Sequence, residues 1–599
     1  MNPRNCRRAV ALGALFTAIL TTAAAAQADI TGQWRGTIAG QYRVVVDIGK
    51  GADLALHGTL TSLDQGGVVI PMDSIGFDGR HTIHFDWKTI GASFDGDLDG
   101  GEIAGNWQQG GARVPLTFRR PGAAAAASLQ PVTRGSVALV PCVAARDDLQ
   151  ALCGTFDVYE NRATRTGRKI ALNVMILPAL SKTPAADPVF GFAGGPGQAA
   201  TTALPQASFI PALRRERDIV LIDQRGTGKS NPLRCPFDPS DVRRLLERPE
   251  GLEQITSCRA ALEKVADLTQ YTTANSSDDA DDVRAALGYD RVNVVGGSYG
   301  SLAALDYLRR HESHVRAVAI EGIVPPDYRL PLSFAKTIQG SLGHLFADCA
   351  ADVACHKDFP RLEAEFDSIV KRLDRAPAQF DLPDSASGKP LRITLSRGAF
   401  VTSLRPMLYQ PGVVSQLPYV IDRVYQGDWD GYAALAILLG RALEQEIARG
   451  MAWSVVCQES LPFIGEQDIK TATAGTYLGE YDIRMYQKRC GVWPKARAAS
   501  DFTSAVRSTV PTLLIAGDED PATPTPTARH AAEQLRNSLV VGIPFGTHAT
   551  SAACIDRIIV QFIDAGSTGG LDTQCVNQIH NPPFLTLEQV ARARGQGAH

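Results

Sequence analysis

The chain has 599 residues, too many for one ordinary domain, and typical domain sizes favour two to four. Its 60 Lys and Arg residues nearly balance 63 Asp and Glu residues, and this formal charge of −3 excludes a strongly basic nucleic-acid-binding protein. Hydrophobic residues make up 44% of the chain, which excludes a disordered chain, and a mean hydropathy near zero excludes a polytopic membrane protein.

The first 28 residues have the three parts of a secretory signal. Arg4, Arg7 and Arg8 precede an apolar run at 9–20, and the segment ends in the small-x-small pattern Ala-Gln-Ala that signal peptidase cleaves. The apolar run is shorter than the roughly 20 residues that a membrane span needs. We therefore expect export to the periplasm or the extracellular space, with cleavage near Ala28 and without a membrane anchor.

Eleven cysteines are an awkward, odd number for a disulfide-bonded secreted protein. Cys6 lies inside the expected signal and is removed with it, which leaves ten. Nearest-neighbour pairing is our prediction, although the count allows many other pairings: Cys142 with Cys153, Cys235 with Cys258, Cys349 with Cys355, Cys457 with Cys490, and Cys554 with Cys575. Because these couples lack C-x-x-C spacing and accompanying histidine pairs, we expect no metal site and no cofactor.

Residues 29–120 are predicted to form an all-β, barrel-like accessory domain. Apolar and polar residues alternate around 44–48, 83–87 and 114–118, with Gly and Asp clusters between them. Gly-x-Trp patterns at Trp34 and Trp107 are typical of small up-and-down barrels. Core packing is the favoured interpretation of these tryptophans, and a platform for a ligand is the alternative.

An alanine-rich stretch after the last expected strand predicts a linker at 121–135. Beyond it, strands at 169–177, 188–193, 218–223, 291–295 and 317–320 alternate with helices near 277–287 and 299–310. This alternation over 136–330 is typical of a mostly parallel, doubly wound sheet. Residues 331–500 are predicted to be helical and strand–helix order returns at 501–599, so we expect a helical lid inserted into an α/β core.

The segment Gly296-Gly297-Ser298-Tyr299-Gly300 matches the pattern G-x-S-x-G. The string alone is a weak signal, but it follows an apolar strand and precedes a helix-forming run, as a nucleophile elbow requires. Glycines suit such a turn because it is tight and strained. We therefore predict that Ser298 is a catalytic nucleophile at the carboxyl edge of the sheet.

A serine hydroxyl needs a positioned base to take its proton, and in this arrangement the acid and then the base follow the serine along the chain. His548 lies in the loop after the expected strand at 538–543, where the base belongs. We predict His548 as the general base, with His580 near the C-terminal end as the alternative.

The acid is expected in the loop after the strand at 512–516, where Asp518, Glu519 and Asp520 compete. Asp520 is our choice because it lies just before the prolines that stiffen the loop, whereas Asp518 can bond the turn backbone. The acid needs only to accept a hydrogen bond from Nδ1 of the histidine.

An oxyanion hole needs backbone N–H groups beside the nucleophile. One is expected from Tyr299, directly after Ser298. The other is expected from Gly194 or Gly195, in the segment Gly-Gly-Pro-Gly-Gln that follows the strand at 188–193. A plain Gly/Pro turn is the alternative interpretation of that segment.

Together these motifs resemble the α/β-hydrolase serine peptidases of the proline iminopeptidase and secreted tripeptidyl aminopeptidase group. Over about residues 136–580 the matching segments stand in family order: 194–197, 223–230, 296–301, 517–524, and the His548 loop followed by Cys554. The resemblance implies the α/β-hydrolase fold with an inserted lid, a triad of Ser298, Asp520 and His548, and peptide substrates. Ala193 stands where proline iminopeptidases usually carry histidine, and the β-domain lies outside the usual family plan.

An exopeptidase must recognise the free α-amine of its substrate, and members of this group use lid carboxylates for that purpose. Glu459, in Cys-Gln-Glu-Ser at 457–460, is the candidate, and a solvated helix-face charge is its alternative interpretation. Asp223 and Arg225 are interpreted as structural. We expect an exported serine aminopeptidase that acts through an acyl-enzyme; the alternatives are an esterase with the same triad and a ligand-binding protein dominated by its β-domain.

Overall fold

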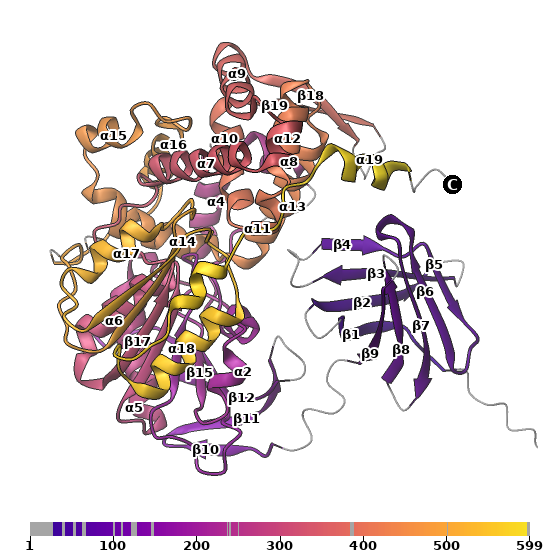
Figure 1. The fold of residues 1–599 in the computed structure, drawn as a ribbon. Helices are drawn as coiled ribbons and strands as arrows, with labels where there is room; N and C mark the ends of the chain where they lie inside the picture. Colours follow the sequence, from indigo (N-terminus) through magenta and orange to yellow (C-terminus); the bar gives the residue numbers. More distant parts are fainter. Residues whose placement is uncertain are drawn as a thin grey trace, which may run out of the picture. The chain divides into compact units, whose positions relative to one another are not determined.

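The computed structural model describes residues 28–595, apart from short segments at 39–41, 52–54, 63–67, 100–101, 110–111, 121–128, 145–148, 237, 239–240, 250, 384–388, 497 and 500. The expected signal peptide, including Cys6, lies outside the described residues except for Ala28, and so does more than half of the expected linker. The chain divides into two compact units, Met1–Pro121 and Gly122–His599, which are coloured along the sequence in Figure 1.

The first unit is a nine-stranded antiparallel meander, as the alternating pattern predicts. Its strands are β1 Gly32–Ile38, β2 Tyr42–Lys50, β3 Leu56–Ser62, β4 Val68–Pro71, β5 Ser74–Phe77, β6 Thr82–Trp87, β7 Ala92–Asp99, β8 Glu102–Gln109 and β9 Ala112–Arg119. Their order is β4-β3-β2-β1-β9-β8-β7-β6-β5, so the first and last strands pair. The edge strands β4 and β5 are joined by Met72 and Asp73. The Met72 N–H donates to the Gly58 carbonyl at 2.9 Å, and the Asp73 N–H donates to the Asp86 carbonyl at 2.8 Å. The meander therefore curls almost to closure.

Aromatic side chains fill the interior of this unit. Trp34 is 0% exposed and Trp107 is 3% exposed. Nε1 of Trp34 donates to the Ile30 carbonyl at 2.8 Å, and the Trp107 ring centroid lies 5.0 Å from that of Trp87. Core packing of Trp34 and Trp107 is confirmed, and their interpretation as a ligand platform is wrong because neither ring reaches the surface.

The second unit is built on a ten-stranded sheet of order β10-β11-β12-β13-β15-β14-β16-β17-β20-β21. The first four strands and β15 pair antiparallel, and β15, β14, β16, β17, β20 and β21 run parallel. Their bounds are β10 Val132–Arg134, β11 Val137–Val143, β12 Gln150–Tyr159, β13 Lys169–Leu177, β14 Val189–Phe192, β15 Ile219–Ile222, β16 Val292–Gly297, β17 Val315–Glu321, β20 Thr512–Gly517 and β21 Ser538–Ile543.

Helices cover both faces of this sheet, so the doubly wound prediction is confirmed (Figure 1). One apolar cluster joins the sheet to α5 (Thr273–Leu287), α6 (Tyr299–His311) and α17 (Thr525–Ala532). The other joins its opposite face to α2 (Ile210–Leu213) and α18 (Ala553–Ala565). The central strands are buried on both faces, which explains their continuous apolar runs.

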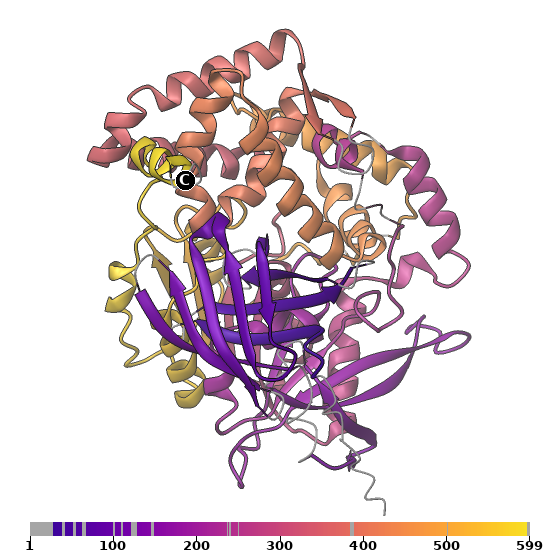
Figure 2. The same cartoon turned by 90° about the vertical axis from the view of Figure 1, so that its right-hand side faces the viewer.

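The lid lies between β17 and β20 and gathers on one side of the core in Figures 1 and 2. It has its own apolar core and consists of α7 Phe334–Ala351, α8 Val353–Asp358, α9 Leu362–Arg375, α10 Arg397–Leu408, α11 Pro411–Val414, α12 Leu417–Tyr425, α13 Asp430–Glu446, α14 Arg449–Val455, a π-helical turn Val456–Ser460, α15 Glu466–Thr473 and α16 Tyr481–Gly491. A hairpin, β18 Ala378–Pro383 with β19 Pro390–Leu395, departs from the all-helical prediction. Its Leu382, Ile393 and Leu395 are buried in the lid core.

Disulfides join the ten cysteines of the described chain in the five expected pairs. The Cys142–Cys153 bond crosslinks neighbouring strands β11 and β12, and the Cys457–Cys490 bond ties the π-helical turn to α16. Cross-links of this kind stabilise mainly by restricting the unfolded chain. Within the described part of the chain, no helix is both long and apolar enough to span a membrane.

The first unit offers a matched test of interior packing. A Cβ atom on Gly105 in β8 would lie less than 3.0 Å from Asp95 and Gly96 backbone atoms of the paired strand, whereas a Cβ on Gly49 in β2 would meet nothing within 4 Å. Gly105→Ala should therefore destabilise the first unit by about 2 kcal/mol or more, and Gly49→Ala by much less. Scanning calorimetry of the full chain measures both; equal melting temperatures for the two variants would contradict this packing.

Candidate active site

Ser298 lies in a strained turn between β16 and α6. Its backbone angles are φ 55° and ψ −127°, a combination that costs a non-glycine residue on the order of 1–3 kcal/mol. The Ser298 N–H donates to the Glu321 carbonyl at 3.0 Å, and Ser301 donates to the Ser298 carbonyl through its N–H and its Oγ at 2.8 and 2.6 Å. These bonds hold the turn in the geometry of a nucleophile elbow.

The glycines of the motif are required by close approach. A Cβ atom on Gly296 would lie less than 3.0 Å from the Gly300 carbonyl oxygen, and one on Gly300 would lie that close to the Phe192 carbonyl oxygen. The start of α6 is therefore pressed against the carboxyl end of β14. Any larger residue at either glycine would push Ser298 away from the sheet edge.

Asp520 and His548 form a hydrogen-bonded pair at the ends of β20 and β21. Nδ1 of His548 lies 2.8 Å from Oδ2 of Asp520, whose side chain is 1% exposed. The carboxylate also accepts from Ala522 N–H at 2.7 Å, Thr523 N–H at 3.0 Å and Thr523 Oγ1 at 2.8 Å. Burial alone would raise the pKa of Asp520, but His548 and these donors together lower it below its usual value.

The competing side chains lie elsewhere. Oε2 of Glu519 accepts from Asn581 at 2.7 Å. The His580 ring packs on Phe545, with 5.3 Å between ring centroids. The Asp518 N–H donates to the Ile543 carbonyl at 3.0 Å, as expected of a residue that closes the turn after its strand. Of the three acids proposed for this loop, Asp520 is the one that contacts His548.

Gly322 connects the Ser298 turn to the imidazole. It follows Glu321, whose carbonyl accepts from Ser298, and has φ +53°. A Cβ atom on Gly322 would lie 3.3 Å from Cε1 of His548 and 3.1 Å from Oγ1 of Thr523. Ser298 and the His548 ring therefore border the same turn, although they are 250 residues apart in the chain.

A lid residue that the sequence did not single out holds the histidine loop. The ring of Tyr409, directly after α10, lies 4.4 Å from the His548 ring, centroid to centroid, with an interplanar angle of 32°. Its carbonyl accepts from Thr547 Oγ1 at 2.7 Å and from Ala549 N–H at 3.0 Å, on both sides of His548. No local motif marks Tyr409, because its role arises only when the lid packs on the core.

The glycine loop after β14 lies beside the nucleophile. A Cβ atom on Gly194 would be 3.3 Å from Cβ of Ser298, and Gly195 has φ +111°. The lid fastens this loop, since Ala448 N–H donates to the Gly197 carbonyl and Gln198 Nε2 donates to Glu446, both at 2.9 Å. Tyr299 is the first residue of α6, and N–H groups there have no partner within the helix.

Glu459 lies in the π-helical turn and is buried, at 3% exposure, so its interpretation as a solvated charge is wrong. Oε1 accepts from the Thr273 N–H at 2.7 Å and Oε2 from Thr273 Oγ1 at 2.6 Å. The same Oγ1 lies 2.8 Å from the Tyr299 hydroxyl. Burial raises the pKa of Glu459 to about 8. This carboxyl group is therefore coupled, through Thr273, to Tyr299, the residue that follows Ser298.

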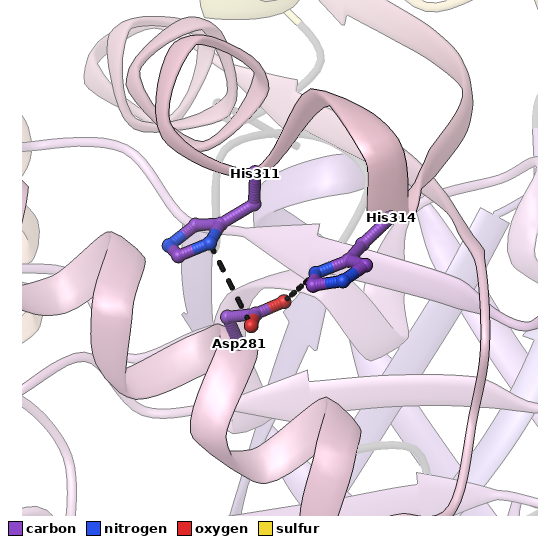
Figure 3. A group of neighbouring side chains, drawn as sticks. All are labelled: Asp281, His311 and His314. Carbon is purple, nitrogen blue, oxygen red and sulfur yellow. Dashed lines mark hydrogen bonds and ion pairs between the residues drawn. The ribbon is translucent and has the colours of Figure 1, made fainter.

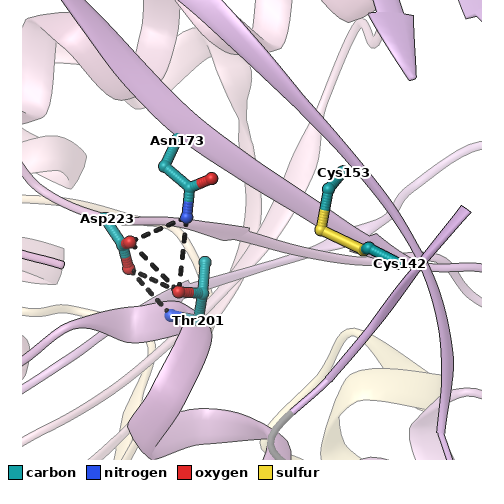
Figure 4. The surroundings of a disulfide bond; sticks show 5 residues. All are labelled: Cys142, Cys153, Asn173, Thr201 and Asp223. Carbon is teal, nitrogen blue, oxygen red and sulfur yellow. Dashed lines mark hydrogen bonds between the residues drawn. A yellow bond between two sulfur atoms is a disulfide. The ribbon is translucent and has the colours of Figure 1, made fainter. Parts of the chain in front are cut away.

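Asp223 and Arg225 brace the core, as interpreted from the sequence. Asp223 accepts from Thr201 N–H at 3.0 Å, from Thr201 Oγ1 at 2.9 Å and from Asn173 Nδ2 at 2.8 Å (Figure 4). Arg225 is 0% exposed and donates to both carboxylate oxygens of Asp279, at 2.7 and 2.8 Å. All of these partners belong to the α/β core, as expected of side chains that brace it.

Asp281, His311 and His314 form a group in which the potential ligand atoms lie within 4.8 Å of one another (Figure 3). Nδ1 of His314 lies 2.8 Å from the Asp281 carboxylate and Nδ1 of His311 lies 3.6 Å from it. The same carboxylate accepts from Arg284 Nε at 2.7 Å and from the Tyr307 hydroxyl at 3.1 Å. These ion pairs and hydrogen bonds account for the arrangement, which lies one helix length, about 20 Å, from Ser298 along α6.

Two family models match the second unit. One describes the α/β-hydrolase fold and matches residues 187–374, and the other describes TAP-like proteins and matches residues 475–575. The chain has the α/β-hydrolase fold. The first match contains Ser298 and the second contains Asp520 and His548, and neither includes the β-unit.

The chain is also similar to curated proteins and to solved structures. It is 25% identical to serine protease Hip1 of Mycobacterium tuberculosis over 468 residues, which cover 71% of this chain and 87% of that protein. It is 22% identical to tripeptidyl aminopeptidase of Streptomyces coelicolor (60% and 70% covered) and 24% identical to carboxylesterase B of Mycobacterium tuberculosis (71% and 86%). The crystal structure of a Mycobacterium smegmatis proline iminopeptidase covers 69% of this chain and 98% of its own, with 17% identity and a TM-score of 0.34.

The raised pKa of Glu459 predicts a pH-dependent stability. The pKa rises from 4.5 to about 8 on folding, so between these values the folded protein holds more protons and loses stability as the pH rises. Glu459→Gln reproduces the neutral carboxyl and can keep both contacts with Thr273. Between pH 5 and 8 the wild-type free energy of unfolding should fall relative to the variant by up to about 1.4 kcal/mol per pH unit. Denaturant titrations measure it; parallel pH profiles would contradict the assignment.

Proposed function

We propose that the protein is an exported serine aminopeptidase that releases residues or short peptides from peptide N-termini through an acyl-enzyme at Ser298. One observation carries the proposal: the strained Ser298 turn and the His548–Asp520 pair border the same residue, Gly322. The five disulfides support an oxidising compartment, in agreement with the expected signal peptide. The similarity to a tripeptidyl aminopeptidase and a serine protease supports peptides as substrates.

In the proposed mechanism, His548 takes the proton of Ser298 as Oγ attacks the scissile carbonyl carbon. Asp520 accepts from Nδ1, which fixes the tautomer of the imidazole and stabilises the imidazolium that forms. The N–H groups of Tyr299 and of Gly195 or Gly194 would bind the oxyanion. His548 then protonates the departing amine, and a water molecule, activated in the same way, hydrolyses the acyl-enzyme and frees Ser298.

Glu459 is the proposed site for the substrate amine. Each of its carboxyl oxygens accepts one hydrogen bond from Thr273 and keeps a further lone pair for an ammonium group. A carboxyl with a pKa of about 8 is largely neutral at pH 7. A positive amine would lower that pKa and form an ion pair with the carboxylate, so that substrates with a free N-terminus bind selectively.

An esterase with the same triad is the second candidate, favoured by the similarity to a protein named carboxylesterase B. Both reactions need the same nucleophile, base and oxyanion site and differ in the leaving group. A binding protein dominated by the β-unit has lost its support, since Trp34 and Trp107 are buried.

Removal of the nucleophile tests the mechanism. Ser298→Ala should reduce hydrolysis of every substrate by about 10³-fold or more, because covalent catalysis is lost while the fold is retained. Ser567→Ala, at an exposed serine of the same unit, is the control and should keep full activity. Initial rates measure the loss of hydrolysis, and a thermal melt of each variant checks that the fold is retained. Undiminished turnover by Ser298→Ala would contradict the assignment of Ser298 as the nucleophile.

Matched substrates test the aminopeptidase assignment. Peptide amides with a free N-terminus should be cleaved at least tenfold faster than their N-acetylated counterparts, because acetylation removes the charge that Glu459 would bind. Mass spectrometry of the products also gives the number of residues released per cut. Equal cleavage of both sets, or cleavage of p-nitrophenyl esters alone, would instead support the second candidate.

A further inference from the structure

Arg405 is a cation close to the proposed catalytic histidine. It lies in the last turn of α10, four residues before Tyr409, and residues at this spacing share one face of a helix. The Tyr409 ring stacks on His548, so the same face of this lid segment carries Arg405 and the aromatic contact to the base. Its guanidinium also interacts electrostatically with Tyr328 and Tyr486.

Nε and Nη1 of the Arg405 guanidinium are buried without hydrogen-bond acceptors. Among the described residues, neither Nε nor Nη1 has a partner, and Cζ lies 3.9 Å above the Phe334 ring. Burying an N–H group without a hydrogen-bond acceptor destabilises the fold, and the free-energy cost is larger when the group is charged. Such a fork of donors matches the geometry of a carboxylate.

Positive charge is in excess around this position. Arg248, Arg405 and Arg489 interact electrostatically with one carboxylate, Asp482, which itself accepts from Thr402 Oγ1 at 2.8 Å. Arg248 donates to the neutral Ser403 hydroxyl at 3.1 Å and Arg489 to the Pro249 carbonyl at 2.9 Å. Three guanidinium groups therefore interact with the same carboxylate, and a further anion would find two unpartnered donors on Arg405.

We propose that Arg405 binds a carboxylate group of the substrate beside Tyr409 and His548. The inference rests on the proposed function and narrows its substrate class to peptides that carry an acidic side chain or a free C-terminal carboxylate near the scissile bond. The Phe334 ring and the side chains of Tyr328, Tyr409 and Tyr486 lie around the guanidinium. Asp520 does not compete for the guanidinium, because its carboxylate oxygens already accept hydrogen bonds from His548, Ala522 and Thr523.

The test compares substrates that differ only in this charge. Peptides with Glu or Gln on the acyl side, peptides with Glu or Gln on the leaving side, and free-acid or amide C-termini separate the possible sources of the carboxylate. A p-nitrophenyl monosuccinate ester and its neutral succinamate ester form a further pair that reports on Arg405 even if peptide bonds are not cleaved. The variants are Arg405→Gln and Arg405→Lys, with Arg372→Gln as control, since Arg372 lies over Tyr425 elsewhere in the lid.

In at least one pair, wild-type kcat/KM should be about 10–100 times higher for the charged member, mainly through KM, as expected of a hydrogen-bonded charge pair. Arg405→Gln should abolish this preference, while its kcat/KM for the neutral substrate should stay within about threefold of wild type. Arg405→Lys should restore part of the preference for the charged substrate, and Arg372→Gln should retain all of it. Absence of a preference in every pair, or a preference that survives Arg405→Gln in a variant with a normal thermal melt, would overturn the inference. Ester cleavage without peptide cleavage would overturn the aminopeptidase proposal alone.

Discussion

The backbone conformation of Ser298 is the constraint on which the site depends. Two sets of hydrogen bonds stabilise the positive φ of Ser298: its N–H donates to the Glu321 carbonyl, and its own carbonyl accepts from Ser301. In addition, Gly296 and Gly300 allow α6 to pack closely against β14. This packing brings the carboxyl ends of β14, β16 and β17 to one place. The glycine loop after β14 then lies beside Ser298, and Gly322 after β17 lies against the His548 ring. The conformation of the Ser298 turn therefore constrains the positions of the glycine loop and of His548.

The lid is part of the site and more than a cover over it. It contacts the glycine loop through Ala448 and Glu446, the histidine loop through Tyr409, and Thr273 at the start of α5 through Glu459. A movement of the lid would therefore disturb the glycine loop after β14, the His548 loop and Tyr299 together. The Cys457–Cys490 disulfide restrains the turn that carries Glu459, which keeps the buried carboxyl close to Thr273.

Chain order and apolar strands of recognisable length made the places of Ser298, Asp520 and His548 after β16, β20 and β21 predictable, and the resemblance pointed to the same three residues. The sequence favoured Asp520 over Asp518 from its place in the loop, and the structure separates the two by the 2.8 Å contact between Asp520 Oδ2 and His548 Nδ1. Tyr409, Thr273 and Arg405 had no signal, since their roles come from packing between distant segments. The β18–β19 hairpin was missed because its two six-residue strands lie within a helical region and one is bounded by prolines.

The two side chains proposed to bind substrate charges, Glu459 and Arg405, belong to opposite sides of the proposed reaction. Glu459 is coupled through Thr273 to Tyr299, on the side of the nucleophile, whereas Arg405 lies one helical turn from Tyr409, on the side of the base that protonates the leaving group. A short peptide carries an ammonium group at one end and a carboxylate at the other, in the same order as these partners. Glu459 is largely neutral at pH 7 until a positive amine lowers its pKa, and Arg405 has two donors without acceptors, so a substrate with both termini would satisfy both groups. Under the proposed function, and if the partner of Arg405 is the terminal carboxylate, this arrangement would favour short peptides with both termini free.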